Sequence, residues 1–591
     1  MADTKKTLVT KKDASTSDET SKASQLGEED QVDNQAEDLD PTNLYGITRV
    51  EVEDFIEEME NEIIVAGPQK VGMFDFTYEN PKHFTWLIVA FASMGGLLFG
   101  LDQSLISGAN LFMPKELGLD KREVSLVNAS MPLGAVGGAC FLHVANEYLG
   151  RRKTIILAAV LYTVGAALQA GAINYATMIS GRVILGLGVG LETGTVPIYV
   201  AETVERRLRG NLVSLYQFNI ALGEVLGFVV AAIFLKVPGN WRYILGSSVV
   251  FSILMLVGYE LRKKSLRCCH GLFSQNVILN GKTLEAYRVW KRIRGLASFE
   301  SKAEFFVMKR TVDDEDREFK AKASAVRFVW MDFITVPQRR RAFVYANIMI
   351  LLGQFVGING IMYYMSILMQ QIGFDEAEST YMSMVGGGAL LIGTIPAILL
   401  MERCGRRFWA ITMLPGFFIG LVICGCSYLV PIDENVAATE GLYLTGLILY
   451  MAFYGPYACL TWVIPSEVYP TYLRSYGMAT SDGMVFLGSF IITYNFTAMQ
   501  EAMTKTGLTL GFFGGIAVVG WFYQILLMPE TKDMTLEEIE VVFSKPSKEL
   551  MRENIASSTR TMSHILHFRF SEAFSGFYRK DVDPTNEGKS G

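Results

Sequence analysis

The sequence contains few cysteines, few histidines and few charged residues. Its 7 cysteines have no regular spacing, which excludes a disulfide scaffold and a cysteine-rich zinc framework. Its 5 histidines are scattered, so we predict no metal site and no cofactor. No nucleophile–base pair and no phosphate-binding loop is evident, so we expect no catalytic residues and no enzyme. We also expect no nucleic-acid partner.

Apolar residues dominate what remains of the composition. Hydrophobic residues make up 50% of the 591-residue chain, and the mean hydropathy is +0.27. Charged residues make up 19%, against about 25% in a typical soluble domain. A soluble core does not need this much apolar surface. The composition therefore predicts a polytopic membrane protein whose surroundings are the lipid bilayer.

The first 60 residues differ from the rest of the chain. They carry 17 acidic and 6 basic residues, a local net charge of −11, whereas the whole chain has a net charge of −7. Segments rich in Ser, Thr, Asp and Glu but poor in aromatics stay solvated. We predict a largely disordered cytosolic tail over 1–83, with a short acidic helix around Val50–Ile64. No basic region followed by an apolar stretch opens the chain, so no cleaved signal peptide is expected.

Apolar runs long enough to cross a ~30 Å hydrocarbon layer recur from Phe84 onward. The pattern predicts an all-α membrane protein with twelve spans in two sets of six. The spans are expected at 84–110, 124–145, 154–173, 176–200, 212–235, 242–259, 342–368, 379–401, 408–430, 442–465, 476–497 and 508–528. The predicted domains are a six-helix bundle (84–259), a cytoplasmic central loop with short helices (260–341), a second six-helix bundle (342–528) and a cytosolic tail (529–591).

The loops predict the orientation, because short cytoplasmic loops concentrate Lys and Arg. Loops after even-numbered spans are basic, as in Arg151-Arg152-Lys153. Loops after odd-numbered spans are short and acidic or neutral, as at Asp375-Glu376. Both termini and the central loop are therefore expected in the cytoplasm.

Two loop motifs repeat between the halves. Glu147-Tyr148-Leu149-Gly150-Arg151-Arg152 after the second span matches Glu402-Arg403-Cys404-Gly405-Arg406-Arg407 after the eighth, at an offset of 255 residues. Glu202 with Arg209 after the fourth span matches Glu467 with Arg474 after the tenth. Parallel repeats of this kind indicate a central substrate site with alternating access.

Further motifs make the resemblance specific. They are Gly181-Arg182 followed by Gly186, Gly188 and Gly190; Pro197-Ile198-Tyr199 leading to Glu202; Gly357-Ile358-Asn359 leading to Tyr363-Tyr364; and Pro529-Glu530-Thr531-Lys532 leading to Leu536-Glu537-Glu538. Over residues 84–543 the chain resembles the sugar porter family of the major facilitator superfamily, and its acidic tail is similar to those of fungal members. The resemblance implies a plasma-membrane transporter that imports a sugar or polyol with proton symport.

Asp102 lies inside the first span, where a charge costs about 2.5–3.5 kcal/mol and marks function unless it is paired. Arg182 is the expected partner, because each residue lies about six residues, or roughly 9 Å, from the outer end of its span. In proton-coupled sugar porters the acid at this position takes up a proton and releases it during the cycle. The resemblance therefore assigns proton coupling to Asp102 and Arg182.

The resemblance also suggests a sugar site. The residues at family positions that hydrogen-bond or stack against a sugar are Gln217, Gln354, Asn359, Tyr363 and Trp462, and to these we add Glu224 and Asp482. Four departures from the family pattern, at Gly353, Leu390, Asp482 and Gly483, argue against a narrow hexose pocket. Glu192 is another acid near the core. With four acids and one arginine there, some acids are expected to be protonated or to contact substrate hydroxyls.

The loop motifs predict a cytoplasmic gate of arginines paired with acids and with helix C-terminal carbonyls. Its residues are Glu147, Arg151, Arg152, Glu202, Arg209, Glu402, Arg406, Arg407, Glu467 and Arg474.

Three functions stay open at this level. The leading one is a proton-coupled importer of a sugar or polyol, and the second is a facilitative uniporter on the same fold. The third is a nutrient receptor that binds sugar without moving it. Receptors of that type tend to have long C-terminal tails, and only about 60 residues follow Met528 here.

Overall fold

The computed structural model forms two compact units, residues 1–82 with 264–326, and residues 83–263 with 327–591. The structure describes residues 48–66, 81–203, 209–261, 283–294, 299, 301–303, 305–307, 309–310, 313, 329–431, 435–470, 473–532, 534 and 536–566. The predicted disorder of the first 47 residues lies outside these ranges. No strand occurs within them.

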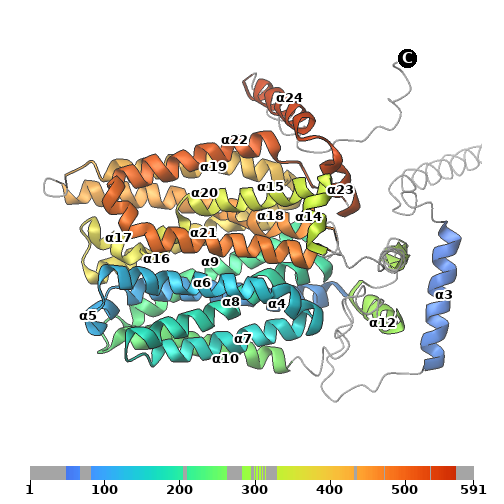
Figure 1. Cartoon of the computed structure of the whole chain (residues 1–591), viewed down its shortest axis with the longest axis horizontal. Helices are drawn as coiled ribbons and strands as arrows, with labels where there is room; N and C mark the ends of the chain where they lie inside the picture. Colours follow the sequence, from blue (N-terminus) through green and yellow to red (C-terminus); the bar gives the residue numbers. More distant parts are fainter. Residues whose placement is uncertain are drawn as a thin grey trace, which may run out of the picture. The chain divides into compact units, whose positions relative to one another are not determined.

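The larger unit is a bundle of long helices (Figure 1). Its first half contains α4 (Pro81–Ala109), α5 (Met113–Leu117), α6 (Lys121–Tyr148), α7 (Arg151–Ala170), α8 (Tyr175–Thr203), α9 (Arg209–Phe234) and α10 (Asn240–Leu261). Its second half contains η3 (Val329–Met331), α14 (Asp332–Thr335), α15 (Pro337–Phe355), α16 (Ile358–Tyr363), α17 (Met365–Gln371), α18 (Glu376–Cys404), α19 (Arg406–Ser427), α20 (Val436–Val468), α21 (Arg474–Met503), η5 (Gly507–Phe513), α22 (Gly514–Leu527), α23 (Leu536–Ser544) and α24 (Ser547–Leu566).

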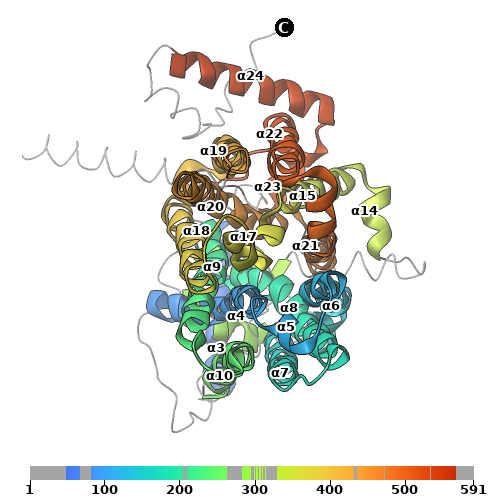
Figure 2. The same cartoon turned by 90° about the vertical axis from the view of Figure 1, so that its left-hand side faces the viewer.

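These helices confirm the predicted fold class of twelve spans in two sets of six. Ten segments of the described chain are long and apolar enough to cross a membrane, and α4 and α21 occupy the two other predicted positions. The halves meet where α6 packs on α21 and where α9 packs on α18 (Figure 2). Many large apolar side chains, among them Phe141, Ile253, Ile392 and Leu399, stay exposed, as a lipid-facing surface requires.

The internal repeat extends to helix ends. Helix α6 begins with a capping box of Asp120 and Glu123, and α18 begins with a capping box of Asp375 and Glu378, at the same offset of 255 residues. Gly150 before α7 and Gly405 before α19 both have positive φ, 76° and 86°. Equivalent positions therefore share local geometry as well as sequence.

One predicted span is broken in the structure. The segment predicted over 342–368 divides into α15, α16 and α17, with Gly357 at φ 93° between the first two helices. A Cβ at this position would lie 2.5 Å from the ring of Phe513. Only glycine fits both this backbone conformation and this contact, and the break turns the polar side chains of α16 toward the first half.

The bundle has two distinct ends, named here the α5 end and the α23 end. Figure 1 places α5 and α17 together at one end of the long helices and α14 and α23 together at the other. Helices α4, α9 and α21 run between them, so positions along each helix give depth.

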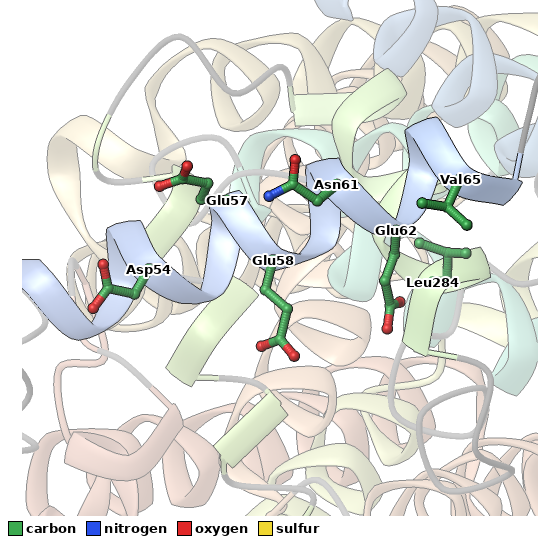
Figure 3. Close-up of a pocket in the computed structure, with 7 residues that line it drawn as sticks. All are labelled: Asp54, Glu57, Glu58, Asn61, Glu62, Val65 and Leu284. Carbon is green, nitrogen blue, oxygen red and sulfur yellow. The ribbon is translucent and has the colours of Figure 1, made fainter.

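The smaller unit combines α3 (Arg49–Ala66) with α12 (Thr283–Arg294) and nearby residues. Helix α3 covers the acidic helix predicted at Val50–Ile64. Val52 and Ile56 are buried with Tyr287 and Phe305 in a separate apolar core. The other face of α3 carries acidic residues around a shallow depression beside Leu284 (Figure 3).

Candidate substrate and proton site

Asp102 and Arg182 form a buried ion pair between α4 and α8. The Asp102 Oδ2 to Arg182 Nη2 distance is 3.4 Å, and the two side chains are 2% and 0% exposed. The guanidinium also donates to the carbonyl of Val127 (2.7 Å) and to Oε1 of Gln169 (3.2 Å). Arg182 is thus held by three partners, and it keeps two of them if Asp102 is protonated. The arrangement lets the carboxyl change charge without leaving the arginine unsolvated.

A chain of three amides starts one residue further along α4. Gln103 donates to Asn359 Oδ1 (3.1 Å), and Asn359 donates to Gln354 Oε1 (2.5 Å). All three side chains are at least 94% buried. The chain crosses from the first half to the second, and its amides both donate and accept hydrogen bonds. It is therefore well suited to substrate hydroxyls.

A second link between the halves joins α9 to α20. The indole N–H of Trp462 donates to Gln217 Oε1 (2.8 Å), and the ring of Tyr216 lies edge-on to the indole with centroids 5.2 Å apart. Together these groups offer one amide and two aromatic rings. Aromatic faces cover the C–H edges of a cyclic polyol while the amide binds a hydroxyl.

Polar contacts continue toward the α5 end. Asn110 donates to Asn128 Oδ1 (3.0 Å) and to the carbonyl of Tyr363 (3.2 Å), so the backbone of α16 is tied to the first half. The Tyr363 hydroxyl lies 3.7 Å from the sulfur of Met131. Ser107 and Ser366 are also within hydrogen-bond distance, 3.3 Å.

Three further acids are buried without such partners. Glu224 on α9 is 3% exposed and its Oε2 accepts no hydrogen bond from the protein. Glu192 on α8 and Asp482 on α21 are 4% and 2% exposed, and Oε1 of the first and both oxygens of the second are likewise unbonded. The side chain of Thr193, the residue after Glu192, lies beside the Asp482 carboxyl. Asp482 takes no part in the amide chain or in the Trp462–Gln217 link.

The α23 end holds a charged network. Arg406 donates to Glu402 (2.6 and 2.9 Å) and to Glu467 (2.6 and 3.2 Å). Glu402 also accepts the backbone N–H of Gly210 at 2.6 Å, and Asn211 accepts the backbone N–H of Glu402 at 3.1 Å. Both of the last two contacts join the first half to the second. This network bridges the two halves at the α23 end.

Arg407 and Glu530 anchor the same end within the second half. Arg407 donates to the carbonyls of Met528 and Ile525. Glu530 accepts the backbone N–H groups of Arg406 (2.9 Å) and Arg407 (3.1 Å). Burial raises the pKa of Glu530 above its ordinary value, although the Arg406 charge and these N–H groups oppose the rise.

The other predicted gate residues belong to the first half or to α21. Arg474 is buried, Arg151 donates to the carbonyl of Asn146 (3.3 Å), and Glu147 is exposed. The side chains of Arg152, Glu202 and Arg209 lie outside the part of the chain that the structure describes. The charged network described above is built mainly from α18, α19 and α20 of the second half.

Ion pairs join the halves at the α5 end as well. Lys115 contacts Glu376 at 2.6 Å and Lys121 contacts Glu501 at 2.7 Å, with all four side chains at least 46% exposed. Exposed pairs contribute about 0–1 kcal/mol each. The contacts at the α5 end are thus weaker than the buried network at the α23 end.

Several polar residues of this region carry no sequence motif. Gln103, Asn128 and Gln169 are buried and bonded to site residues. The available signal is a polar residue inside an apolar span, which is expensive in lipid and needs a partner. Their partners depend on helix rotation, which the motifs do not specify.

Comparisons with known proteins agree with this architecture. The family described as "Sugar (and other) transporter" matches residues 88–543. The chain is 64% identical over 516 residues to the myo-inositol transporter FST1 of Gibberella moniliformis, covering 87% of this chain and 88% of that protein. It is 28% identical to a human proton myo-inositol cotransporter, covering 81% of this chain and 85% of that protein.

The fold also matches a solved structure. The proton:xylose symporter XylE, solved with 6-bromo-6-deoxy-D-glucose, superimposes with a TM-score of 0.68 at 22% identity, over 78% of this chain and 100% of that one. The family match spans both six-helix halves and every motif of the site described above. The chain therefore belongs to the sugar (and other) transporter family, and it is a transporter and not an enzyme.

Proposed function

We propose that this protein imports a cyclic polyol, myo-inositol or a close relative, across the plasma membrane together with a proton. Both termini, and with them the α23 end, face the cytoplasm. The observation that carries the proposal is the position of two neighbours on α4. Asp102 contacts Arg182, and the next residue, Gln103, contacts Asn359 across the halves.

The amide chain supports a polyol substrate. Each hydroxyl of a cyclitol both donates and accepts, as do the amides of Gln103, Asn359 and Gln217. A bound polyol would exchange protein–protein hydrogen bonds for protein–substrate bonds of similar strength. The names of the relatives support the same class, since two of them are myo-inositol transporters. The departures at Gly353 and Leu390 argue for a ring other than glucose.

Coupling follows from the rigidity of α4. Protonation of Asp102 removes its charge from the pair with Arg182, so α4 is free to move relative to α8. Any such movement carries Gln103 with it and changes the contact with Asn359. Substrate binding and protonation therefore act on the same helix turn, which is the requirement for symport.

The orientation rests on the loops. Basic residues gather at Arg151–Lys153 and at Arg406–Arg407, both at the α23 end, whereas Asp375 and Glu376 lie at the α5 end. Positive residues mark the cytoplasmic side of a membrane protein. Import then means substrate entry at the α5 end and release at the α23 end.

Uptake of labelled myo-inositol, glucose and xylose tests the proposal, in a host without its own carriers and with external pH recorded. We expect myo-inositol uptake that alkalinises the medium and stops with a protonophore. Asp102→Asn should abolish uphill accumulation while exchange persists, because Arg182 retains two partners. Two pH units supply about 2.7 kcal/mol and 150 mV about 3.5 kcal/mol, so roughly 10⁴-fold accumulation is at stake.

Glu553→Gln is the matched control, since this acid is exposed on α24 and pairs with Lys545. It should accumulate substrate normally. Myo-inositol uptake that leaves the medium pH unchanged would replace symport by facilitative uniport. Specific binding without any uptake would favour the receptor alternative.

A further inference from the structure

Glu192 and Asp482 are not used by the site described above, and they come from opposite halves. Both carboxyls are buried, at 4% and 2% exposed; Oε1 of Glu192 accepts no hydrogen bond from the protein, and the Asp482 carboxyl has the Thr193 side chain beside it. Burying an unpaired ionised carboxylate is strongly unfavourable. The free-energy cost of burying these two carboxyls must therefore be reduced, either by a partner or by protonation.

The helices that carry them are in contact at this depth. Leu191 on α8 and Ala479 on α21 share a small buried cluster with Leu142 on α6. Phe99, one turn after Gly95 on α4, packs edge-on against Phe486, one turn after Asp482 on α21, with ring centroids 5.6 Å apart. The two carboxyls thus face the same boundary between the halves.

Helix α4 also contacts one member of this acid pair. The Glu192 carboxyl lies against the backbone of Gly95, where an added Cβ would come within 1.5 Å of Oε1. Gly95 precedes Asp102 by seven residues, about 10 Å along the helix toward the α23 end. The acid pair is therefore separate from the Asp102–Arg182 pair and lies nearer the proposed cytoplasmic exit.

Other titratable groups surround the pair. The Tyr162 hydroxyl on α7 donates to the carbonyl of Leu98 (2.9 Å). It lies within electrostatic range of both Asp102 and Glu192. On α6, His143 stacks on Tyr476 of α21 with ring centroids 4.9 Å apart. None of these supplies a fixed positive charge to the acids, so the compensation available to them is a shared proton.

We propose that Glu192 and Asp482 form a single-proton acid pair between the two halves. With one proton the carboxyls bond to each other and hold α8 against α21. With none they repel and force these helices apart, because two adjacent carboxylates in a dry site cannot both stay ionised. The pair acts as a second proton site that delays opening of the α23 end until its proton is released.

This inference rests on the proposed proton coupling, but its test needs no substrate. Gly483→Cys, in a background whose native cysteines are replaced by serine, places a thiol beside α6, 3.9 Å from Ala139 Cβ. Its modification by a maleimide reports separation of α21 from α6 in the reconstituted full-length protein. Each rate is divided by the rate for the unfolded protein at the same pH, which removes the intrinsic titration of the thiol.

We expect the corrected rate to rise at least about tenfold from pH 5 to pH 9, which corresponds to about 1.4 kcal/mol in the opening equilibrium. Glu192→Gln and Asp482→Asn should each remove this dependence, and the double variant should behave like either single one. Effects that add, or a retained pH dependence in Glu192→Gln, would overturn the pair.

Two further variants separate a specific effect from misfolding. Asp482→Glu keeps the carboxyl and should retain the pH dependence. Glu224→Gln removes a third buried acid, on α9, and this variant should also retain the pH dependence. If Glu224→Gln also lost the pH dependence, the dependence would come from buried acids in general and not from the pair, and the proposal would be overturned. If myo-inositol uptake were not coupled to protons but the labelling still depended on pH, the proposed symport would be refuted and the acid pair would not.

Discussion

Gly210 of the first half contacts the charged network at the α23 end, next to Asn211. Its backbone N–H donates to Glu402 at 2.6 Å, and a Cβ added there would lie 2.7 Å from both Glu402 Oε1 and Arg406 Nη2. These atoms cannot simply rotate away, since Arg406 is 2% exposed and is bonded to Glu467 on its other side. Gly210→Ala therefore forces the halves apart or breaks part of the network.

The size of the effect follows from the bonds at risk. Hydrogen bonds to charged groups contribute about 1.5–3 kcal/mol each. Losing one of them in the state closed at the α23 end shifts the opening equilibrium by roughly 10- to 150-fold toward the open state. Arg406 and Glu402 remain paired within the second half, so we expect folding and membrane insertion to survive.

The assay is maleimide labelling of a thiol placed at the α23 boundary, with uptake measured in parallel. Gly210→Ala should label at least about tenfold faster than the parent, and its affinity for external substrate should fall in proportion. Gly388→Ala is the matched control, because an added Cβ there meets no atom within 4 Å. Equal labelling of Gly210→Ala and the control would refute the reasoning.

Three other outcomes are expected. Gln217→Ala leaves the indole N–H of Trp462 buried without its acceptor, so apparent substrate affinity in uptake assays should fall about 5- to 150-fold while surface delivery is normal. Gly357→Ala combines a positive φ with a clash against a phenylalanine ring, so the thermal unfolding temperature in detergent should drop. Hydrogen bonds from Arg242 and then from the Trp241 indole lower the pKa of Glu116, so the link between α5 and α10 is present above the ordinary carboxyl pKa and is lost as pH falls through the lowered value. Glu116→Gln should therefore destabilise the purified protein at pH 7, and its difference from the parent should shrink as the pH is lowered through that range.

The sequence predicted the fold well because lipid imposes simple rules on it. The lengths of the apolar runs predicted the membrane spans, and the matching charged motifs in the loops predicted the internal repeat. One signal of the repeat was missed: Asp120 with Glu123 and Asp375 with Glu378 are capping boxes at the same offset of 255 residues as the loop motifs. Depth along the spans also predicted that Asp102 and Arg182 could meet, and the structure places them 3.4 Å apart.

Contacts between the halves were harder to predict, because they depend on how each helix is rotated and where it breaks. Gln103 and Asn359 meet only because α15 ends and Gly357 redirects the chain into α16. Asp482 was expected among the sugar-binding residues from its family position, and that role stays a prediction. The structure buries it on α21, a helix that packs on α6 and α8 of the first half, and a motif within one half cannot encode such packing.

Helix α4 connects the proposed parts of the transport cycle. Gly95 receives the Glu192 carboxyl, Asp102 holds Arg182, and Gln103 reaches the amide chain, all within nine residues of one helix. A helix segment of this length moves as a rigid rod, so a displacement at one of these positions is felt at the other two. The proposed order of events then follows from depth: Asp102 lies nearer the α5 end and is expected to take up its proton first, whereas the proposed Glu192–Asp482 pair lies nearer the α23 end and is expected to control release.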